Sequence, residues 1–275
     1  MGQSLGQSLS SGINHTTVSM TDSTTGTKRD KDWILSIDAL HAQGNLAKAY
    51  SLLSTAYNQK DPSHDDHDVE LLWRYARGCF NQQETMRVLD KNNRKTDKAK
   101  EEALIRQGLQ LANDAIQIDQ HHYGGHKWKA ILLSELGNYT PLTEKIQNSF
   151  VIRQELDLAL TLYPAQQDSI TLFAIGKWCQ TVSSVGWMQR QMASALFAKP
   201  PHATHEEALG YFQRAYDICP TKRCAFAMGE CYYELNEMLK CQQWMQTCLD
   251  CPSSTSSAST SAVDEDFDTK AKSFL

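Results

Sequence analysis

The sequence lacks the segments that direct a protein into or across a membrane. No window reaches the roughly eighteen uninterrupted apolar residues that a membrane-spanning helix needs, and the N-terminus has neither the apolar stretch of a signal peptide nor the arginines of a mitochondrial presequence. The opening MGQSLG resembles a myristoylation signal but has Gly6 where Ser or Thr is required. We therefore expect a cytoplasmic protein without a lipid anchor, in which the eight cysteines stay reduced.

The chain has no surplus of positive charge. Its 27 Lys and Arg residues face 32 Asp and Glu residues, which gives a formal net charge of -5 at pH 7. A general nucleic-acid binder needs a basic field that attracts phosphates, so the composition argues against this class. Local basic patches are still compatible with an acidic total.

Motifs for catalysis are also missing. The sequence has no HExxH, GxxxxGK or GxGxxG, so we predict a protein that is not an enzyme and that has no cofactor. Two clusters contain metal-capable side chains, SHDDHD at residues 63–68 and HHYGGH at residues 121–126, and both fall where we expect loops between helices. A lone cluster in a loop has no outer shell to orient its ligands, so we predict no metal site.

The cysteines do not form a zinc motif. Cys248 and Cys251 make one CxxC, but zinc needs four converging ligands and a second CxxC is absent. The helical register places Cys241 and Cys248 in a contact between helices. We interpret these cysteines as small hydrophobic packing residues.

What the sequence does contain is helical periodicity. The stretch THEEALGYFQRAYDICP carries a predicted capping box, Thr204 with Glu207, and then places Ala208, Phe212 and Ala215 on one helix face. Two alanines beside one phenylalanine suit a neighbouring helix that lies close and accepts a single large side chain. This small, large, small pattern followed by proline is typical of the second helix of a tetratricopeptide unit, whose period is about 34 residues.

The same spacing recurs along the chain, each time after an expected front helix, so we predict five helix pairs. One pair cannot bury its apolar face alone, and the pairs should therefore stack into an all-α, tetratricopeptide-like α-solenoid with a groove and no β-sheet. The front helices are expected near Trp33, Glu70, His126, Asp168 and Cys224. The back-helix triplets are Ala49, Leu53 and Ala56; Gly108, Ala112 and Ala115; Ile152, Leu156 and Ala159; Ala208, Phe212 and Ala215; and Cys241, Met245 and Cys248.

Composition divides the chain into three segments. Residues 1–31 are rich in Ser, Thr, Gly, Gln and Asn and are predicted to be a disordered tail. Residues 32–252 carry the repeats. Residues 253–275 are predicted to form a polar linker followed by a C-terminal helix.

The predicted C-terminal helix has its own cap and apolar face. Ser261 and Asp264 have capping-box spacing, and Phe267, Ala271 and Leu275 share one side. We expect this helix to cover the end of the array, because the last repeat otherwise exposes its apolar face to water.

Basic residues in two places are the candidate partner-binding residues. The segment DKNNRKTDKAK, in the inserted connection of the second pair, either meets an acidic partner surface or is a solvated loop. Residues on the front helices either grip an acidic peptide or lipid headgroup in the groove or form ion pairs with neighbouring helices. The candidates are Lys91, Arg94, Lys95 and Lys98 in the loop, and Arg74, Arg77, Lys129, Lys177, Trp178 and Arg190 on or beside the front helices.

The fourth pair matches a known family more closely than a generic repeat does. GKWCQTVSSVGWMQRQMASALFAKPPHATHEEALGYFQRAYDICP, residues 176–220, resembles the regulator of microtubule dynamics family in its W-C pair, its W-x-Q-R, its L-F-x-x-P-P turn and its E-E-A-L-x-Y-F-x-R-A helix. ELLWRYAR and HKWKAILLSELGNY resemble earlier blocks of the family in the same order, so the resemblance spans about residues 68–220. The N-terminal tail and the cysteine-rich fifth pair depart from the family pattern. No catalytic residue is transferred.

The resemblance implies a helical-repeat domain that associates with microtubules, including those of the spindle. Members with an N-terminal membrane anchor work at organelle membranes and contact sites, and a related domain is implicated in phospholipid binding. Without that anchor the chain looks most like the soluble member of the family. The resemblance implies a location in the cytoplasm, at microtubules, at the spindle and at spindle poles. Mitochondrial association is a further expected location. The leading hypothesis is a non-enzymatic protein whose basic patches dock on tubulin. The alternatives are a phospholipid-binding protein that uses the groove and an adaptor that binds an acidic peptide.

Overall fold

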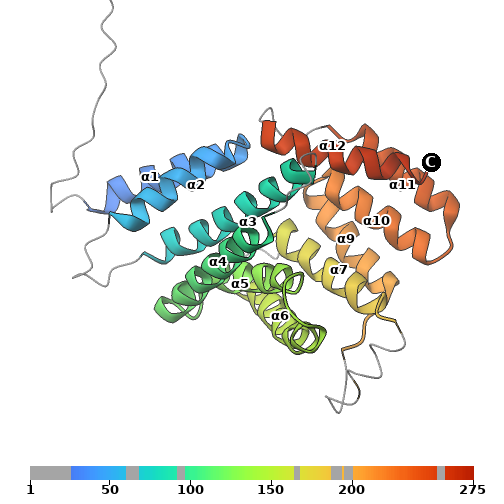
Figure 1. Cartoon of the computed structure of the whole chain (residues 1–275), viewed down its shortest axis with the longest axis horizontal. Helices are drawn as coiled ribbons and strands as arrows, with labels where there is room; N and C mark the ends of the chain where they lie inside the picture. The colour runs from blue at the N-terminus through green and yellow to red at the C-terminus, as the bar shows by residue number, and fades with distance from the viewer. Residues whose placement is uncertain are drawn as a thin grey trace, which may run out of the picture.

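The chain is described by a computed structural model over residues 26–59, 68–91, 97–163, 168–186, 194, 201–252 and 258–275. These residues form eleven α-helices and no strand, as Figure 1 shows. The helices are α1 (Gly26–Ala42), α2 (Leu46–Asn58), α3 (Val69–Lys91), α4 (Lys98–Ile118), α5 (Tyr123–Leu136), α6 (Leu142–Leu162), α7 (Ser169–Ser183), α9 (His205–Ile218), α10 (Lys222–Glu234), α11 (Met238–Asp250) and α12 (Ala258–Lys272).

The helices are arranged as the predicted pairs. α1 packs on α2, α3 on α4, α5 on α6, α7 on α9 and α10 on α11, and each pair also contacts the next one along the chain. In Figure 1 the pairs follow one another along a curved row from blue to red. The predicted all-α solenoid of five helix pairs is therefore confirmed.

The fourth pair shows why the small, large, small spacing produces this packing. Thr204 and Glu207 form the predicted capping box, with the Glu207 amide donating to the Thr204 hydroxyl over 3.2 Å. Ala208, Phe212 and Ala215 are all buried on one face of α9. The Phe212 ring fits against Gly176 of α7, where an added Cβ would lie only 2.6 Å from the ring.

The other triplets have the same role. Leu53, Leu156 and Met245 are the large members of three of them and are buried, as are Ala49, Ala159, Cys241 and Cys248, while Ala56 is only partly buried. Most of the buried residues from Ile37 to Cys231 belong to one continuous core, while Cys241, Met245 and Cys248 belong to a second cluster at the C-terminal end. All eight cysteines are free, and seven of them are buried, which agrees with their interpretation as packing residues.

The third pair begins earlier than the sequence suggested. α5 starts at Tyr123, so most of HHYGGH lies in a helix and not in a loop. His122 is the N-cap, and its Nδ1 accepts a hydrogen bond from the Gly124 amide over 3.2 Å. Gly124 is needed there for space, because a Cβ on it would lie 2.8 Å from the ring of Trp73.

The two ends of the chain differ in part from the expectations. α1 begins at Gly26, upstream of the predicted start at residue 32, and residues 1–25 lie outside the described residues. α12 begins at Ala258, so Ser261 lies inside the helix and is not its cap. Ala271 is fully buried as predicted, but Leu275 is 53% exposed, and Phe274 makes the apolar contact in its place. The limits of the three segments stay predictions.

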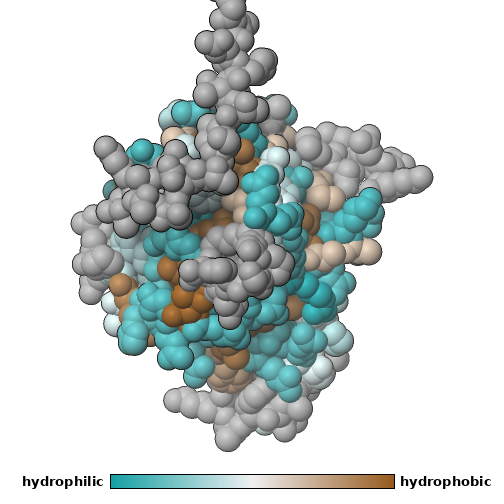
Figure 2. Space-filling view, turned by 90° about the vertical axis from the view of Figure 1, so that its left-hand side faces the viewer, coloured by the Kyte–Doolittle hydropathy of each residue, from teal (hydrophilic) through white to brown (hydrophobic). Residues whose placement is uncertain are grey.

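The curvature of the row brings distant helices together. α12 packs on α10 and α11 and also contacts α3 of the second pair. Arg223 at the start of α10 forms an ion pair with Glu84 of α3 over 2.6 Å, between residues that are 139 positions apart. The face at the left of Figure 1 is mainly hydrophilic with separate hydrophobic patches (Figure 2).

Candidate partner-binding site

Ion pairs connect each front helix to another front helix. Their members lie on α1, α3, α5, α7 and α10 or at the N-cap of α7. Most of them link neighbouring helix pairs, and one of them links the fifth helix pair to the second through α10. We call them the front-helix ion pairs. They are Asp38 with Arg74 and Arg77, Arg87 with Glu135, Lys127 with Asp168, Lys177 with Glu230, and Arg223 with Glu84.

Arg74 and Arg77, two of the predicted partner-binding residues, point at an acidic residue of the first pair. Arg74 Nη2 lies 2.6 Å from Asp38 Oδ2, and Arg77 Nη2 lies 2.9 Å from Asp38 Oδ1. Burial works to raise the pKa of Asp38, but the hydrogen bonds and charges of the two arginines outweigh it and lower that pKa. Arg74 also pairs with Glu70, whose pKa falls to about 2 chiefly because His122 hydrogen-bonds to it.

Lys129 has an acidic partner inside its own pair. Its Nζ lies 2.6 Å from Glu155 Oε1, while Glu155 Oε2 lies 2.6 Å from His126 Nδ1. The other ring nitrogen of His126 lies 2.9 Å from the carbonyl oxygen of Gln120, so both nitrogens face acceptors. The hydrogen bond to Glu155 raises the pKa of His126. For Arg74, Arg77 and Lys129 the structure shows the ion-pairing alternative.

The remaining basic candidates are less enclosed. Lys177 is about half exposed and contacts Gln180 over 2.6 Å and Glu230 over 3.8 Å. Lys98 is exposed at the first position of α4. Lys91 is the last residue of α3, and its side chain lies outside the described residues, as do Arg94, Lys95 and Arg190.

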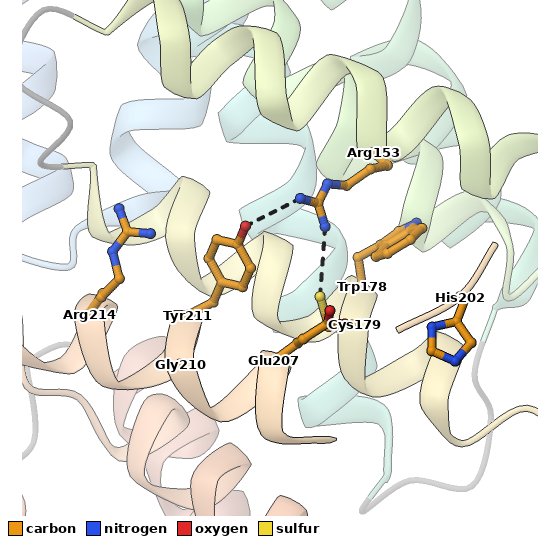
Figure 3. Close-up of a pocket in the computed structure, with 8 residues that line it drawn as sticks. All are labelled: Arg153, Trp178, Cys179, His202, Glu207, Gly210, Tyr211 and Arg214. Atoms are coloured by element: carbon orange, nitrogen blue, oxygen red, sulfur yellow. Dashed lines mark hydrogen bonds between the residues drawn. The ribbon is translucent and has the colours of Figure 1, made fainter. Parts of the chain in front are cut away.

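Trp178 lies in a pocket that sequence reasoning on the front helices missed. The pocket has a volume of about 580 Å³ and opens between α6, α7 and α9 (Figure 3). Figure 3 shows Arg214 and His202 at opposite ends of the pocket, with Arg153 between them. The lining residues are Arg153, Trp178, Cys179, His202, Glu207, Gly210, Tyr211 and Arg214.

Arg153 is held in this pocket by aromatic rings and hydrogen bonds. Its guanidinium carbon lies 5.2 Å from the Trp178 ring centre and 5.6 Å from that of Tyr211. Its Nη2 donates to the Tyr211 hydroxyl over 3.2 Å, and its Nε donates to Asp157 over 2.8 Å. A cation fixed over two rings in this way presents a rigid positive surface.

A second, more apolar pocket of about 370 Å³ shares Trp178 and His202 with the first. It lies between α5, α6 and α7, and the Trp178 indole donates to the Ser149 carbonyl oxygen over 2.8 Å to hold the shared wall in place. Its apolar lining consists of Leu133, Leu142, Ile146, Ile152, Trp178, Val182, Val185 and Ala203.

The lining of the first pocket includes one thiol, that of Cys179. Burial raises the pKa of Cys179 to about 11, so its thiol is protonated at neutral pH and is a poor nucleophile. Within the described ranges, no three His, Cys, Asp or Glu side chains come together in a way that could hold a metal ion. The part of the chain that the structure describes also has no helix that is long and apolar enough to cross a bilayer.

The sequence held a signal for the Trp178 pocket. Trp178 and Cys179 are the W-C pair, while Glu207, Tyr211 and Arg214 belong to the E-E-A-L-x-Y-F-x-R-A helix. The motif block that carries the family resemblance therefore lines the pocket. Periodicity alone could not show this, because Arg153 comes from another helix pair.

The fold and these surfaces define a helical-repeat protein of the tetratricopeptide type. A thermophilic tetratricopeptide protein of Thermus thermophilus is similar in structure, with a TM-score of 0.56 and 13% identity, and the match covers 90% of this chain and 98% of that one. The model of the family "Regulator of microtubule dynamics protein 1-3" matches residues 33–275. The chain belongs to the regulator of microtubule dynamics family.

Similar proteins bear the same family name. Regulator of microtubule dynamics protein 1 of Bos taurus is 32% identical over 220 residues, and that of Pongo abelii is 31% identical over 220 residues. Each match covers 79% of this chain, which spans 64% and 65% of the length of these two relatives. Regulator of microtubule dynamics protein 3 of Xenopus laevis is 30% identical over 206 residues, which is 74% of this chain and 42% of that protein.

Proposed function

We propose that this protein is a non-enzymatic microtubule-associated protein, in which the helical repeats form a rigid scaffold and basic side chains dock on an acidic surface of tubulin. The observation that carries the proposal is family membership over residues 33–275. The fold supports it, because a curved stack of helix pairs presents an extended surface to a protein partner. The same association would bring the protein to spindle microtubules and spindle poles.

The connection between α3 and α4 is the preferred docking segment. Lys98 is exposed there and has Lys91, Arg94 and Lys95 close by in the sequence. Arg74, Arg77, Lys129 and Lys177 would first have to give up acidic partners within the chain. We therefore assign the first electrostatic contact to the connection and treat the front-helix candidates, with Trp178 and Arg190, as secondary.

Co-sedimentation with microtubules at rising salt tests the proposal. A protein with a net charge of -5 can dock only through a local basic patch, so the bound fraction should fall steeply between low salt and roughly 0.15 M, where the screening length is about 8 Å. The quadruple change Lys91→Glu, Arg94→Glu, Lys95→Glu and Lys98→Glu should abolish pelleting at low salt.

The matched control reverses four exposed basic residues elsewhere, namely Lys48→Glu, Arg106→Glu, Lys240→Glu and Lys272→Glu. Both variants change the total charge by the same amount. Their binding to microtubules should therefore differ only if the connection between α3 and α4 has a specific role. Absence of pelleting by the unchanged protein, or equal loss in both variants, would refute the assignment.

A second candidate is phospholipid binding, with mitochondrial association as its expected location. It is favoured by the apolar pocket beside Trp178, which adjoins the cations Arg153 and Arg214 and so offers separate places for an acyl chain and a phosphate. Native mass spectrometry of freshly purified protein should then show bound lipid, and Val182→Trp, which fills the apolar pocket, should remove it. A spectrum of the bare polypeptide alone would discard this candidate.

A further inference from the structure

The C-terminal helix α12 covers a surface shared by two distant helix pairs. It contacts α3 of the second pair and α10 and α11 of the fifth, and Figure 1 shows it across the top of these helices. α3 and α10 are joined beneath it by the ion pair of Glu84 with Arg223. The guanidinium carbon of Arg223 lies 5.6 Å from the ring centre of Phe267 on α12. We call the surface of α3, α10 and α11 that α12 covers the α12 seat.

A buried cation lies in the seat. The Lys222 side chain is 5% exposed, and its Nζ lies 2.7 Å from Asp268 Oδ1 of α12. The same Nζ donates to the carbonyl oxygens of Cys248 and Leu249 at the end of α11, over 3.1 and 3.2 Å. All three donors of the ammonium group are used. Asp268 is 32% exposed, but its loss would leave the buried Lys222 ammonium without an anionic partner, so the seat favours a carboxylate at the position of Asp268.

Aromatic contacts hold the rest of α12 in the seat. The Phe267 ring lies 5.6 Å from that of Phe226, and the Phe274 ring lies 5.2 Å from that of Tyr233. Ala271, one turn after Phe267, is fully buried. Spacings of three and four residues between anchors are those of an amphipathic helix lying in a groove.

The apolar surface continues beyond the part that α12 covers. Tyr233 is 46% exposed although Phe274 makes an edge-to-face contact with it, and Met238 and Leu239, just after the α10–α11 turn, are 46% and 71% exposed. These residues lie at the end of the pair where α12 finishes.

α12 itself is a weakly apolar occupant. Its sequence, ASTSAVDEDFDTKAK, has few large apolar side chains, and Phe267 is one of only two aromatic anchors, the other being Phe274 just beyond the helix. The binding of α12 to the seat depends on its ion pair with Lys222 as much as on its buried apolar area. The ion pair of Lys222 with Asp268 would then help to decide which helix fits the seat.

We propose that the α12 seat is a binding site for an acidic amphipathic helix of a partner protein, and that α12 is its intramolecular occupant. The partner helix carries a carboxylate at the position of Asp268, an aromatic residue directly before it and a second aromatic residue six positions after it. A tethered occupant has an effective concentration of the order of millimolar, so only a partner that matches this pattern displaces α12. This site is separate from the connection assigned to tubulin docking.

The test uses the full chain and a fluorescein-labelled peptide of residues 258–275 as a stand-in for the partner helix. Fluorescence anisotropy should show at least tenfold tighter binding to a full chain with Phe267→Ala and Phe274→Ala than to the unchanged chain, because the weakened α12 no longer competes. Circular dichroism confirms that the variant is folded. Equal affinities, or no preference over a scrambled peptide, would overturn the proposal.

Charge reversal tests the role of Lys222. Lys222→Glu in the weakened chain should lower peptide affinity at least tenfold, and a peptide with Asp268→Lys should recover much of the loss. Lys240→Glu is the matched control, since Lys240 is exposed and pairs with Glu237, the N-cap residue of α11. An equal effect of the two reversals would refute a specific carboxylate position.

Hydrogen exchange of the unchanged chain tests whether α12 leaves its seat while the rest of the protein stays folded. Amides of α12 should exchange at least tenfold faster than those of α10 and α11, because α12 must leave its seat while the pair stays folded. Equal protection of the three helices would contradict this. A concentration-dependent dimer that excludes the peptide would assign the seat to the α12 of a second copy and overturn the partner assignment.

Discussion

The fourth and fifth helix pairs solve the same packing problem with different side chains. In the fourth, Phe212 of α9 faces Gly176 of α7, and in the fifth, Met245 of α11 faces Gly229 of α10. A Cβ on Gly176 would lie 2.6 Å from the Phe212 ring, and a Cβ on Gly229 would lie 2.7 Å from the terminal methyl of Met245. The first contact is with a rigid ring and the second with a flexible end. The repeat thus sets the distance between the two helices, while the side chain in the contact determines whether an added methyl group is tolerated.

The first pair attaches to the second through charge as well as apolar contacts. Its Asp38 accepts hydrogen bonds from Arg74 and Arg77 of α3, while Ile37 and Leu53 belong to the continuous core. Charge therefore adds to shape at this junction. The predictions below separate these contributions.

Phe212→Ala should have the largest effect. Phe212 is fully buried, and removing its ring leaves a cavity between α7 and α9. The free energy of unfolding should fall by about 3–5 kcal/mol, measured by urea denaturation. Leu158→Ala on the exposed side of α6 is the control, with an expected change within about 0.5 kcal/mol. Similar losses in both variants would mean that the small, large, small pattern does not carry the packing.

Adding one methyl group at each glycine compares the two pairs directly. Gly176→Ala should lower the free energy of unfolding by about 1–3 kcal/mol, because the buried Phe212 ring cannot move aside. Gly229→Ala should be nearly neutral, since the Met245 methyl can rotate away and alanine favours the helix by about 1 kcal/mol over glycine. Equal losses at the two positions in chemical denaturation would contradict the distinction between a rigid and a flexible contact.

The repeats were predictable because their signals are local. The capping box of Thr204 and Glu207 and the five back-helix triplets each lie within one or two turns of a helix, so periodicity was sufficient. HHYGGH was wrongly expected in a loop because the repeat spacing places the start of this front helix near His126. In the structure Gly124 and Gly125 are helical and lie too close to Trp73 and Ile116 to carry a Cβ.

The sites depended on contacts that sequence spacing does not reveal. Arg74 pairs with Glu70 one turn earlier on its own helix, which spacing can reveal, but also with Asp38, which lies in another helix pair. Arg153 of α6 reaches the W-C pair of α7 only after the pairs stack. The meeting of Arg223 with Glu84 requires the accumulated curvature of the intervening pairs, which no local pattern encodes.

Asp38→Asn should have an intermediate effect, confined to the N-terminal pair. The side chains of Arg74 and Arg77 are mostly buried, and Arg77 would lose its anionic partner. The carboxylate of Asp38 is 37% exposed, so water reduces the loss to about 1–2 kcal/mol, below that of a fully buried pair. Hydrogen exchange should increase in α1 and α2 but not in α9. Asp157→Asn, which loosens the exposed pair with Arg153, is the control, and increased exchange throughout the protein would contradict a local role for Asp38.

The smallest predicted effect is a dependence of stability on pH through His126. Both of its ring nitrogens face acceptors, Glu155 and the Gln120 carbonyl, and the pKa is raised, so the folded state favours the protonated ring. This stabilisation is complete below the unfolded pKa of about 6.5 and is lost as pH rises through the folded pKa. Lys129, which shares Glu155, opposes the shift but does not reverse it.

The melting temperature should therefore fall as pH rises through the window above about 6.5, and His126→Gln should flatten this slope. This window separates His126 from His41. Burial and the charge of Arg77 lower the pKa of His41 to about 4. His41 contributes stability that is present above about pH 6.5 and lost toward pH 4, so its titration lies on the other side of the window. An unchanged slope in His126→Gln would mean that the contact with Glu155 holds a neutral ring, and that charge contributes less to the third pair than to the first.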